Sequence, residues 1–170
     1  MASGIFSGSF DPFTVGHLYI VEGASQLFDN LTICIATNSE KKRTFEKELM
    51  KAGIEATLKE RNITNCEVVC YDGLIVDLAK EKNIQFVIRG MRNAEAFEYE
   101  EIVAKEYYLT GGLETIYVGS GSYVGNGIQS RTSSTLVRQL LKEGKPINEY
   151  VPKSIRNLIV PINSNEDGLK

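Results

Sequence analysis

The chain alternates short apolar runs with longer segments of helical periodicity, and this alternation constrains the fold more than any other feature of the sequence. The apolar runs are rich in Ile, Val and Phe, as buried strands are, and each intervening segment is long enough to cross over a sheet. We predict strands at residues 4–6, 31–36, 67–71, 86–88 and 115–118. We predict helices at residues 16–28, 44–61, 74–82, 94–109, 133–143 and 153–158.

The order of these elements predicts an α/β fold with a five-stranded parallel sheet and helices on both faces. With 170 residues, of which 42% are hydrophobic, the chain is long enough for one domain with its own core. We predict a single domain over residues 1–162 and a flexible, polar tail over residues 163–170. The Gly- and Ser-rich segment 119–130 is predicted to be a loop. Ligands of such a sheet bind at the carboxyl ends of the strands.

The overall charge and the cysteines argue against several classes of protein. A net charge of -3 gives no basic field that would attract nucleic acid. Cys34, Cys66 and Cys70 form no CxxC pair, so the sequence predicts neither a zinc site nor a disulfide framework. The sequence has neither an apolar run of membrane-spanning length nor the pattern of a signal peptide. We therefore expect a cytoplasmic protein with no nucleic-acid or membrane partner.

The segment from Gly8 to His17 joins the first predicted strand to the first predicted helix. Gly8 and Gly16 allow a close approach to a bound anion, and the amides that begin a helix attract phosphate. His17 is the only histidine of the chain, so imidazole chemistry would depend on it. A lone histidine is more often a packing or surface residue, and an ordinary turn uses the same residue types. The position of His17 at the start of a helix that follows a strand favours the functional interpretation.

Two further segments carry candidate phosphate ligands. Arg89, Gly90 and Arg92 follow the fourth predicted strand at its carboxyl end, where a planar guanidinium can bind phosphate and glycine lets a nucleotide approach. Residues 132–135 are hydroxyl side chains at the start of a helix, where they can hold phosphates. A solvated charged loop explains the arginines equally simply, and an N-cap explains the hydroxyl side chains.

Together these segments resemble the HxGH nucleotidyltransferase superfamily, with Thr14 and His17 in its T/HxGH signature and residues 132–138 in its ISSTxxR signature. Arg89 to Arg92 and the FEYE sequence at residues 97–100 resemble the phosphopantetheine adenylyltransferase branch. The resemblance implies a Rossmann-like fold. It also implies a reaction in which AMP passes from ATP to 4'-phosphopantetheine, giving dephospho-coenzyme A and pyrophosphate.

The resemblance assigns roles to individual residues, and the roles fall into three groups. Catalysis is assigned to His17, Lys41 and Arg89. ATP binding is assigned to Ser9, Phe10, His17, Gly90, Met91, Arg92, Glu100, Thr132, Ser133, Ser134 and Thr135. Binding of the acceptor substrate is assigned to Ser9, Lys41, Leu74, Ile75 and Arg89. Core packing explains Leu74 and Ile75 equally well, and we interpret Lys42 and Arg43 as solvated charges.

The resemblance further implies Mg²⁺ bound through the ATP phosphates, with no protein metal site, and feedback by coenzyme A. It implies a homo-oligomer, a hexamer of two stacked trimers. Two alternatives remain at this point. One is a related enzyme such as nicotinate mononucleotide adenylyltransferase, and the other is a nucleotide-binding regulator without turnover. The regulator is suggested by Tyr107 and Tyr108, which stand where the family usually has an Asn-Arg pair.

Overall fold

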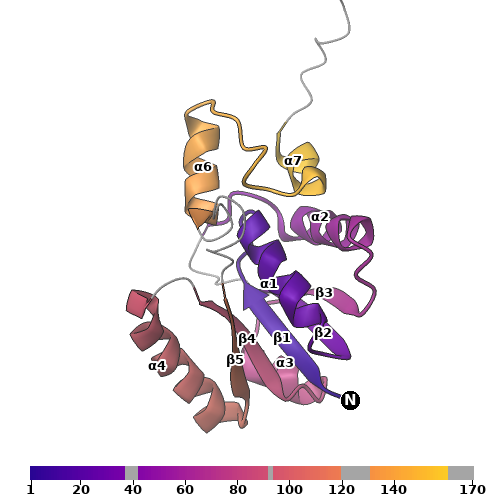
Figure 1. Cartoon of the computed structure of the whole chain (residues 1–170), viewed down its shortest axis with the longest axis vertical. Coiled ribbons are helices and arrows are strands. Elements are labelled where there is room, and N and C mark those ends of the chain that lie inside the picture. Colours follow the sequence, from indigo (N-terminus) through magenta and orange to yellow (C-terminus); the bar gives the residue numbers. More distant parts are fainter. Residues whose placement is uncertain (37–41, 92–93, 120–130, 161–170) are drawn as a thin grey trace, which may run out of the picture.

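A computed structural model describes residues 1–36, 42–91, 94–119 and 131–160, and for residues 94 and 95 the backbone alone. Its strands are β1 (Ser3–Gly8), β2 (Asn30–Ala36), β3 (Cys66–Tyr71), β4 (Phe86–Met91) and β5 (Glu114–Gly119). Its helices are α1 (Val15–Ser25), α2 (Lys47–Glu60), α3 (Ile75–Glu81), α4 (Ala94–Gly111), α6 (Ser134–Lys142) and α7 (Lys153–Ile159). Every strand and helix predicted from the sequence is present (Figure 1).

The five strands form one sheet in the order β3-β2-β1-β4-β5, and all of the neighbouring pairs are parallel. The first strand is therefore at the centre. The chain runs outward from β1 to β3, then crosses to the other side of β1 to form β4 and β5. This reversal creates a switch point at the carboxyl ends of β1 and β4, where the loops diverge and leave room for a ligand.

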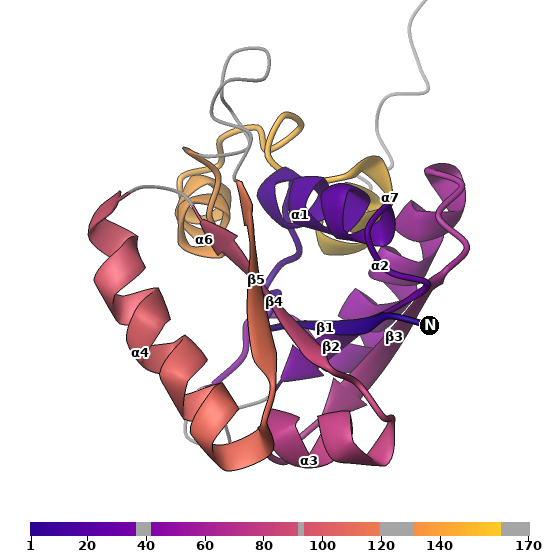
Figure 2. The same ribbon diagram turned by 60° about the horizontal axis from the view of Figure 1, so that its bottom comes forward.

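Helices cover both faces of the sheet, as predicted (Figure 2). Neighbouring strand residues point to opposite faces, so Phe6 of β1 packs in the larger core under α1 and α2, whereas Ile5 packs in the smaller core with α3. Each core packs between one face of the sheet and the helices that cover it. This Rossmann-like arrangement confirms the predicted fold.

The last two described helices lie apart from each other beyond the carboxyl end of β1, with α7 beside α2 (Figure 1). Helix α6 ends where the sequence predicts, because Gly144 adopts a positive φ of 65° just after the last turn. Helix α7 packs closely on α2 at Gly53, where an added Cβ would lie 2.6 Å from Ile155 Cδ1. Among the described residues, no helix is both long and apolar enough to cross a membrane.

Candidate functional site

The only histidine lies in the first turn of α1, and the cap of that helix fixes its orientation. Thr14 is the N-cap, and its hydroxyl accepts the backbone N–H of His17 at 3.4 Å. In return His17 Nδ1 accepts the backbone N–H of Thr14 at 3.0 Å. A backbone amide can only donate, so Nδ1 carries no proton in this arrangement and the neutral ring has its hydrogen on Nε2. The cap thus makes Nε2 a hydrogen-bond donor.

Three phenylalanines hold the imidazole ring from the side of the core. Phe10 meets it edge-on with the ring centroids 5.0 Å apart, and Phe13 and Phe6 lie at 5.5 and 6.3 Å. Phe10 is 1% exposed and has a positive φ of 43°, which is unfavourable for a bulky residue and is held here by burial. The Phe10 side chain is therefore part of the support for His17, and the ATP contact predicted for Phe10 stays a prediction.

Asp11 joins the first loop of the site to the loop that follows β2. It is 7% exposed, and its two carboxylate oxygens accept the backbone N–H groups of Thr44 and Phe45, each at 2.8 Å. Because these amides are bound to Asp11, helix α2 begins at Lys47 and not at residue 44 as predicted. The carboxylate thus fixes the segment just after Lys41 and Lys42 against the His17 loop.

The second predicted motif docks directly on the first. Ser134 donates its hydroxyl hydrogen to the Pro12 carbonyl at 2.8 Å, and Arg138 Nη1 donates to the Asp11 carbonyl. The Ser133 hydroxyl caps α6 by accepting the N–H of Leu136 at 3.1 Å. Two segments more than a hundred residues apart thus place the beginnings of α1 and α6 on either side of one loop. Both helix ends favour phosphate at this place.

The hydroxyl side chains of the second motif have several structural roles. Thr132 is fully buried, and Thr135 Oγ1 accepts a hydrogen bond from Arg138 at 3.3 Å. The N-cap interpretation of Ser133 is therefore correct as far as its side chain is concerned. The phosphate-binding role of this turn, which the sequence suggests, stays a prediction that would rely on its amides.

A cavity of about 350 Å³ opens beside this junction. It is lined by Ser9, Asp11, Ala36, Lys42, Arg43, Thr44 and Arg138. Three of these side chains are cationic, and the one carboxylate, of Asp11, is bound to backbone amides. Within the described ranges neither arginine of the cavity forms an ion pair. The cavity therefore keeps an excess of positive charge, as expected of a phosphate site.

Arg89 and Glu100, both predicted site residues, are bound to each other. Arg89 Nε donates to Glu100 Oε2 at 2.7 Å and Nη2 donates to Oε1 at 3.0 Å. Burial, the largest influence, lowers the Arg89 pKa, but Glu100 more than compensates and the pKa is raised overall. The guanidinium is therefore permanently charged, with one edge turned to Glu100 and Nη1 outside that pair.

Gly90 and Met91 extend β4 beyond the predicted end of the strand, and both are half-buried. An added Cβ at Gly90 would lie 2.3 Å from Ile20 Cδ1. The close neighbour of Gly90 is thus the end of the Ile20 side chain in helix α1, which would have to move for a larger residue. The nucleotide contact expected at this position stays a prediction.

The predicted acceptor-binding residues at the start of α3 differ from each other. Leu74 is 68% exposed, so core packing does not explain it, whereas Ile75 is half-buried against the smaller core. Tyr107 also packs against this core, and Tyr108 is 56% exposed. Packing against the smaller core thus explains Tyr107, and neither tyrosine lines the electropositive cavity.

Some predicted features lie outside the described residues: Lys41, Arg92, the loop after Gly119 and the tail. Sequence reasoning also missed residues. The charge pattern predicts a solvated Arg43, but the side chain is half-buried and donates to the Ser9 carbonyl at 2.8 Å. Nothing in its local charge pattern separates it from exposed Lys42.

In the described part of the chain, no group of three or more His, Cys, Asp or Glu side chains could hold a metal ion.

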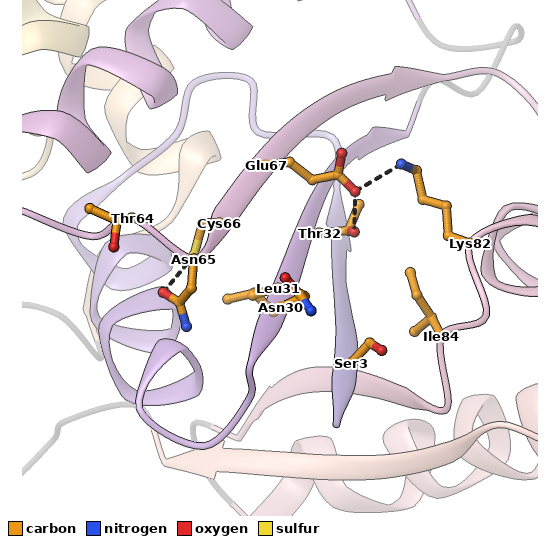
Figure 3. Close-up of a pocket in the computed structure, with 10 residues that line it drawn as sticks. All are labelled: Ser3, Asn30, Leu31, Thr32, Thr64, Asn65, Cys66, Glu67, Lys82 and Ile84. Carbon is orange, nitrogen blue, oxygen red and sulfur yellow. Dashed lines mark hydrogen bonds and ion pairs between the residues drawn. The ribbon is translucent and has the colours of Figure 1, made fainter. Parts of the chain in front are cut away.

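A second cavity, of about 450 Å³, lies at the opposite end of the strands (Figure 3). There Glu67 Oε1 accepts hydrogen bonds from Lys82 Nζ and from the Thr32 hydroxyl, each at 2.8 Å. The ion pair neutralises its own charges. Burial raises the pKa of the Cys66 thiol in this cavity to about 11, so the thiol is protonated at neutral pH. Neither the charge nor the thiol makes this cavity a reactive site.

Comparison with known proteins gives a consistent result. Residues 5–140 match the family described as cytidylyltransferase-like. The chain is 36% identical over 156 residues to a phosphopantetheine adenylyltransferase of Flavobacterium johnsoniae, covering 92% of this chain and 98% of that protein. It is 43% identical over 159 residues to one of Streptococcus pneumoniae, covering 89% and 91%.

Among solved structures, the chain resembles a putative nicotinate-nucleotide adenylyltransferase of Vibrio parahaemolyticus with a TM-score of 0.64. The sequence identity is 18%, and the match covers 93% of this chain and 91% of that one. At this identity the likeness supports the fold alone.

Proposed function

Because this chain belongs to the phosphopantetheine adenylyltransferase family, within the cytidylyltransferase-like proteins, we propose that it transfers AMP from ATP to phosphopantetheine. The products are dephospho-coenzyme A and pyrophosphate. The observation that carries the proposal is the junction of the two motifs, at which the start of α6 binds the Asp11–Pro12 segment that leads to His17, beside an electropositive cavity.

In the proposed reaction a phosphate oxygen of the acceptor attacks the α-phosphorus of ATP. The bond from that phosphorus to the pyrophosphate oxygen breaks, and no covalent enzyme intermediate forms. The attacking oxygen is already anionic, so the protein contributes orientation and charge stabilisation. We assign the α-phosphate to His17 Nε2 and Lys41, the acceptor phosphate to Arg89, and the leaving pyrophosphate to the start of α6.

Mg²⁺ fits the site as a partner of ATP and not of the protein. The described residues offer no cluster of carboxylates for it, and Asp11, the acidic residue of the cavity, uses both oxygens on backbone amides. Bound through the ATP phosphates, the ion would neutralise part of their charge. Chelation with EDTA should then abolish turnover without lowering the melting temperature of the protein.

The decisive experiment follows pyrophosphate release from ATP with one acceptor at a time. The acceptors are phosphopantetheine, nicotinate mononucleotide and none. Release with phosphopantetheine alone is expected. Release with nicotinate mononucleotide alone would contradict the proposed acceptor, and ATP binding without any release would favour a regulator.

We also propose a homo-oligomer, a hexamer as the family resemblance implies, in which α4 contributes a contact between copies. Ile102 and Leu109 lie seven residues apart on one side of α4 and are 67% and 72% exposed, and Tyr108 beside them is 56% exposed. Light scattering should give a multiple of the 18.9 kDa chain mass for the wild type and a smaller species for Leu109→Glu. A monomeric wild type would contradict the proposal.

Feedback by coenzyme A is proposed on the same basis, because coenzyme A contains the pantetheine arm of the acceptor. Coenzyme A added to the pyrophosphate-release assay should raise the apparent KM for phosphopantetheine. An unchanged KM would contradict this regulation.

A further inference from the structure

Arg43 connects the two loops that form the floor of the electropositive cavity. Its Nη1 donates to the Ser9 carbonyl at 2.8 Å, and its Nε donates to the Phe45 carbonyl at 3.0 Å. Ser9 belongs to the loop after β1, and Phe45 belongs to the loop after β2. The guanidinium is therefore fixed between the carboxyl ends of two adjacent strands, where a ligand of this fold binds.

The charge of Arg43 is not neutralised by these contacts. Both acceptors are uncharged carbonyls, and within the described ranges Arg43 forms no ion pair. The nearby Asp11 carboxylate is occupied by the N–H groups of Thr44 and Phe45. Arg89 differs in this respect, because Glu100 holds one edge of its guanidinium. Arg43 is thus a half-buried cation whose counter-ion is missing from the described protein.

One nitrogen of Arg43 also lacks an acceptor. Nη2 is shielded from solvent and has no hydrogen-bond partner within the described part of the chain. A buried donor without a partner costs free energy, so native structures retain few of them, and those few call for an explanation. The side chain lines the cavity together with Ser9, Lys42 and Arg138. An anion that enters the cavity would supply both the acceptor and the counter-charge.

We propose that Arg43 binds a phosphate group of the substrate, with Nη2 donating to a phosphate oxygen after a small shift of the guanidinium. This inference rests on the proposed function and adds a residue to it. The phosphate comes either from the acceptor or from ATP, and both would meet the same cation. Arg43 would bind the substrate directly while its other two nitrogens keep the loops after β1 and β2 together.

The test compares ligands with and without phosphate. Calorimetry on wild type and Arg43→Gln gives two ratios. The pantetheine ratio is the dissociation constant of pantetheine divided by that of phosphopantetheine, and the adenosine ratio is that of adenosine divided by that of ATP. The variant should lower one of these ratios about tenfold, the effect of one charge-assisted hydrogen bond. A lower pantetheine ratio places the acceptor phosphate at Arg43, and a lower adenosine ratio places ATP there.

A loss of loop structure would weaken the binding of the phosphorylated and the unphosphorylated ligand alike, and would therefore leave their ratio unchanged. Unchanged ratios in Arg43→Gln would therefore overturn the proposal, whatever happens to kcat. Arg43→Lys keeps the charge but not the fork of donors, so it should lower the same ratio by about threefold. It also provides the test if Arg43→Gln does not fold, and unchanged ratios in Arg43→Lys would then overturn the proposal.

Arg61→Gln is the matched control. Arg61 follows α2 at the end remote from the site, is 57% exposed and pairs with Glu22 at 3.3 Å. This variant removes the same charge and should leave both ratios and turnover unchanged. Wild-type turnover is measured in parallel: its absence would refute the proposed function, whereas an active wild type with unchanged ratios in Arg43→Gln would refute only the role of Arg43.

Discussion

The two ends of the central strands carry cavities of similar size and polar lining but of different electrostatic character. At the carboxyl ends, Asp11 binds backbone amides while Arg43 and Arg138 bind backbone carbonyls, so positive charge remains. At the amino ends, Glu67 and Lys82 bind each other and their charges cancel (Figure 3). The comparison teaches that the excess of positive charge at one end depends both on the number of charged side chains and on their partners, because three cations and one amide-bound carboxylate line that cavity, whereas one lysine and one glutamate pair in the other.

The largest expected effect is at His17. His17→Ala removes the Nε2 donor, and loss of one such donor lowers kcat by about a hundredfold to a thousandfold. The KM for ATP should change far less, because the interaction strengthens as charge develops on the transferring phosphorus. Steady-state pyrophosphate release measures both constants. A variant with near-normal kcat would remove His17 from the mechanism and leave the carboxyl-end cavity as a binding site only.

The second-largest effect is expected at Asp11, the carboxylate at the carboxyl ends of the strands, in comparison with Glu67 at their amino ends. Asp11→Asn replaces one oxygen by an NH₂ group that faces a backbone N–H, and should lower the free energy of unfolding by about 2 kcal/mol. Urea denaturation measures this loss, and Glu67→Gln is the matched substitution at the other end. Equal losses in the two variants would show that backbone binding of Asp11 is no stronger than the exposed ion pair.

Features that depend on neighbouring residues in the chain could be predicted from the sequence. Features that depend on contacts between distant segments could not. The strands and helices follow from local periodicity, and the T/HxGH and ISSTxxR segments lie where their positions predict. The start of α2 could not be predicted, because Asp11, far away in the chain, takes the amides of Thr44 and Phe45. The interpretation of Arg43 was wrong for the same reason, since only tertiary contact separates it from Lys42.

A smaller effect is expected at Leu74, at the carboxyl end of β3. Its side chain is 68% exposed, so Leu74→Ala should leave stability unchanged within about 0.5 kcal/mol. If Leu74 contacts the pantetheine arm, the acceptor KM rises about threefold to tenfold, as expected for loss of part of an apolar contact, while the KM for ATP stays constant. Initial rates at varied acceptor concentration measure this, and an unchanged acceptor KM would contradict the predicted contact.

The smallest effect is at the amino-end cavity. Burial, the largest influence, raises the pKa of Glu67, but hydrogen bonds from Lys82 and Thr32 lower it by more, so the folded pKa lies below 4.5. The pair therefore stabilises the protein above that pH and loses its contribution as the pH falls through the folded pKa. Because Glu67 is 52% exposed, the contribution at neutral pH should be below about 1 kcal/mol.

Thermal unfolding of wild type and Glu67→Gln as a function of pH measures this contribution. The difference in melting temperature should be present at pH 7 and disappear as the pH falls through the lowered pKa of Glu67. In a Lys82→Met background the same substitution should have a smaller effect. A difference that grows with acidity would mean that the pair does not stabilise the fold.

The contacts of Ser134 and Arg138 with the Asp11–Pro12 segment also set an order of events during protein synthesis. The five strands and the smaller core are complete once residue 119 has left the ribosome, whereas the larger core still lacks Val137, Ile147, Val151 and Ile155. The junction beside His17 forms only after residue 138 has emerged. A polypeptide interrupted between these points would have all five strands but an incomplete larger core and no functional site, so activity and the final packing of that core would be gained together.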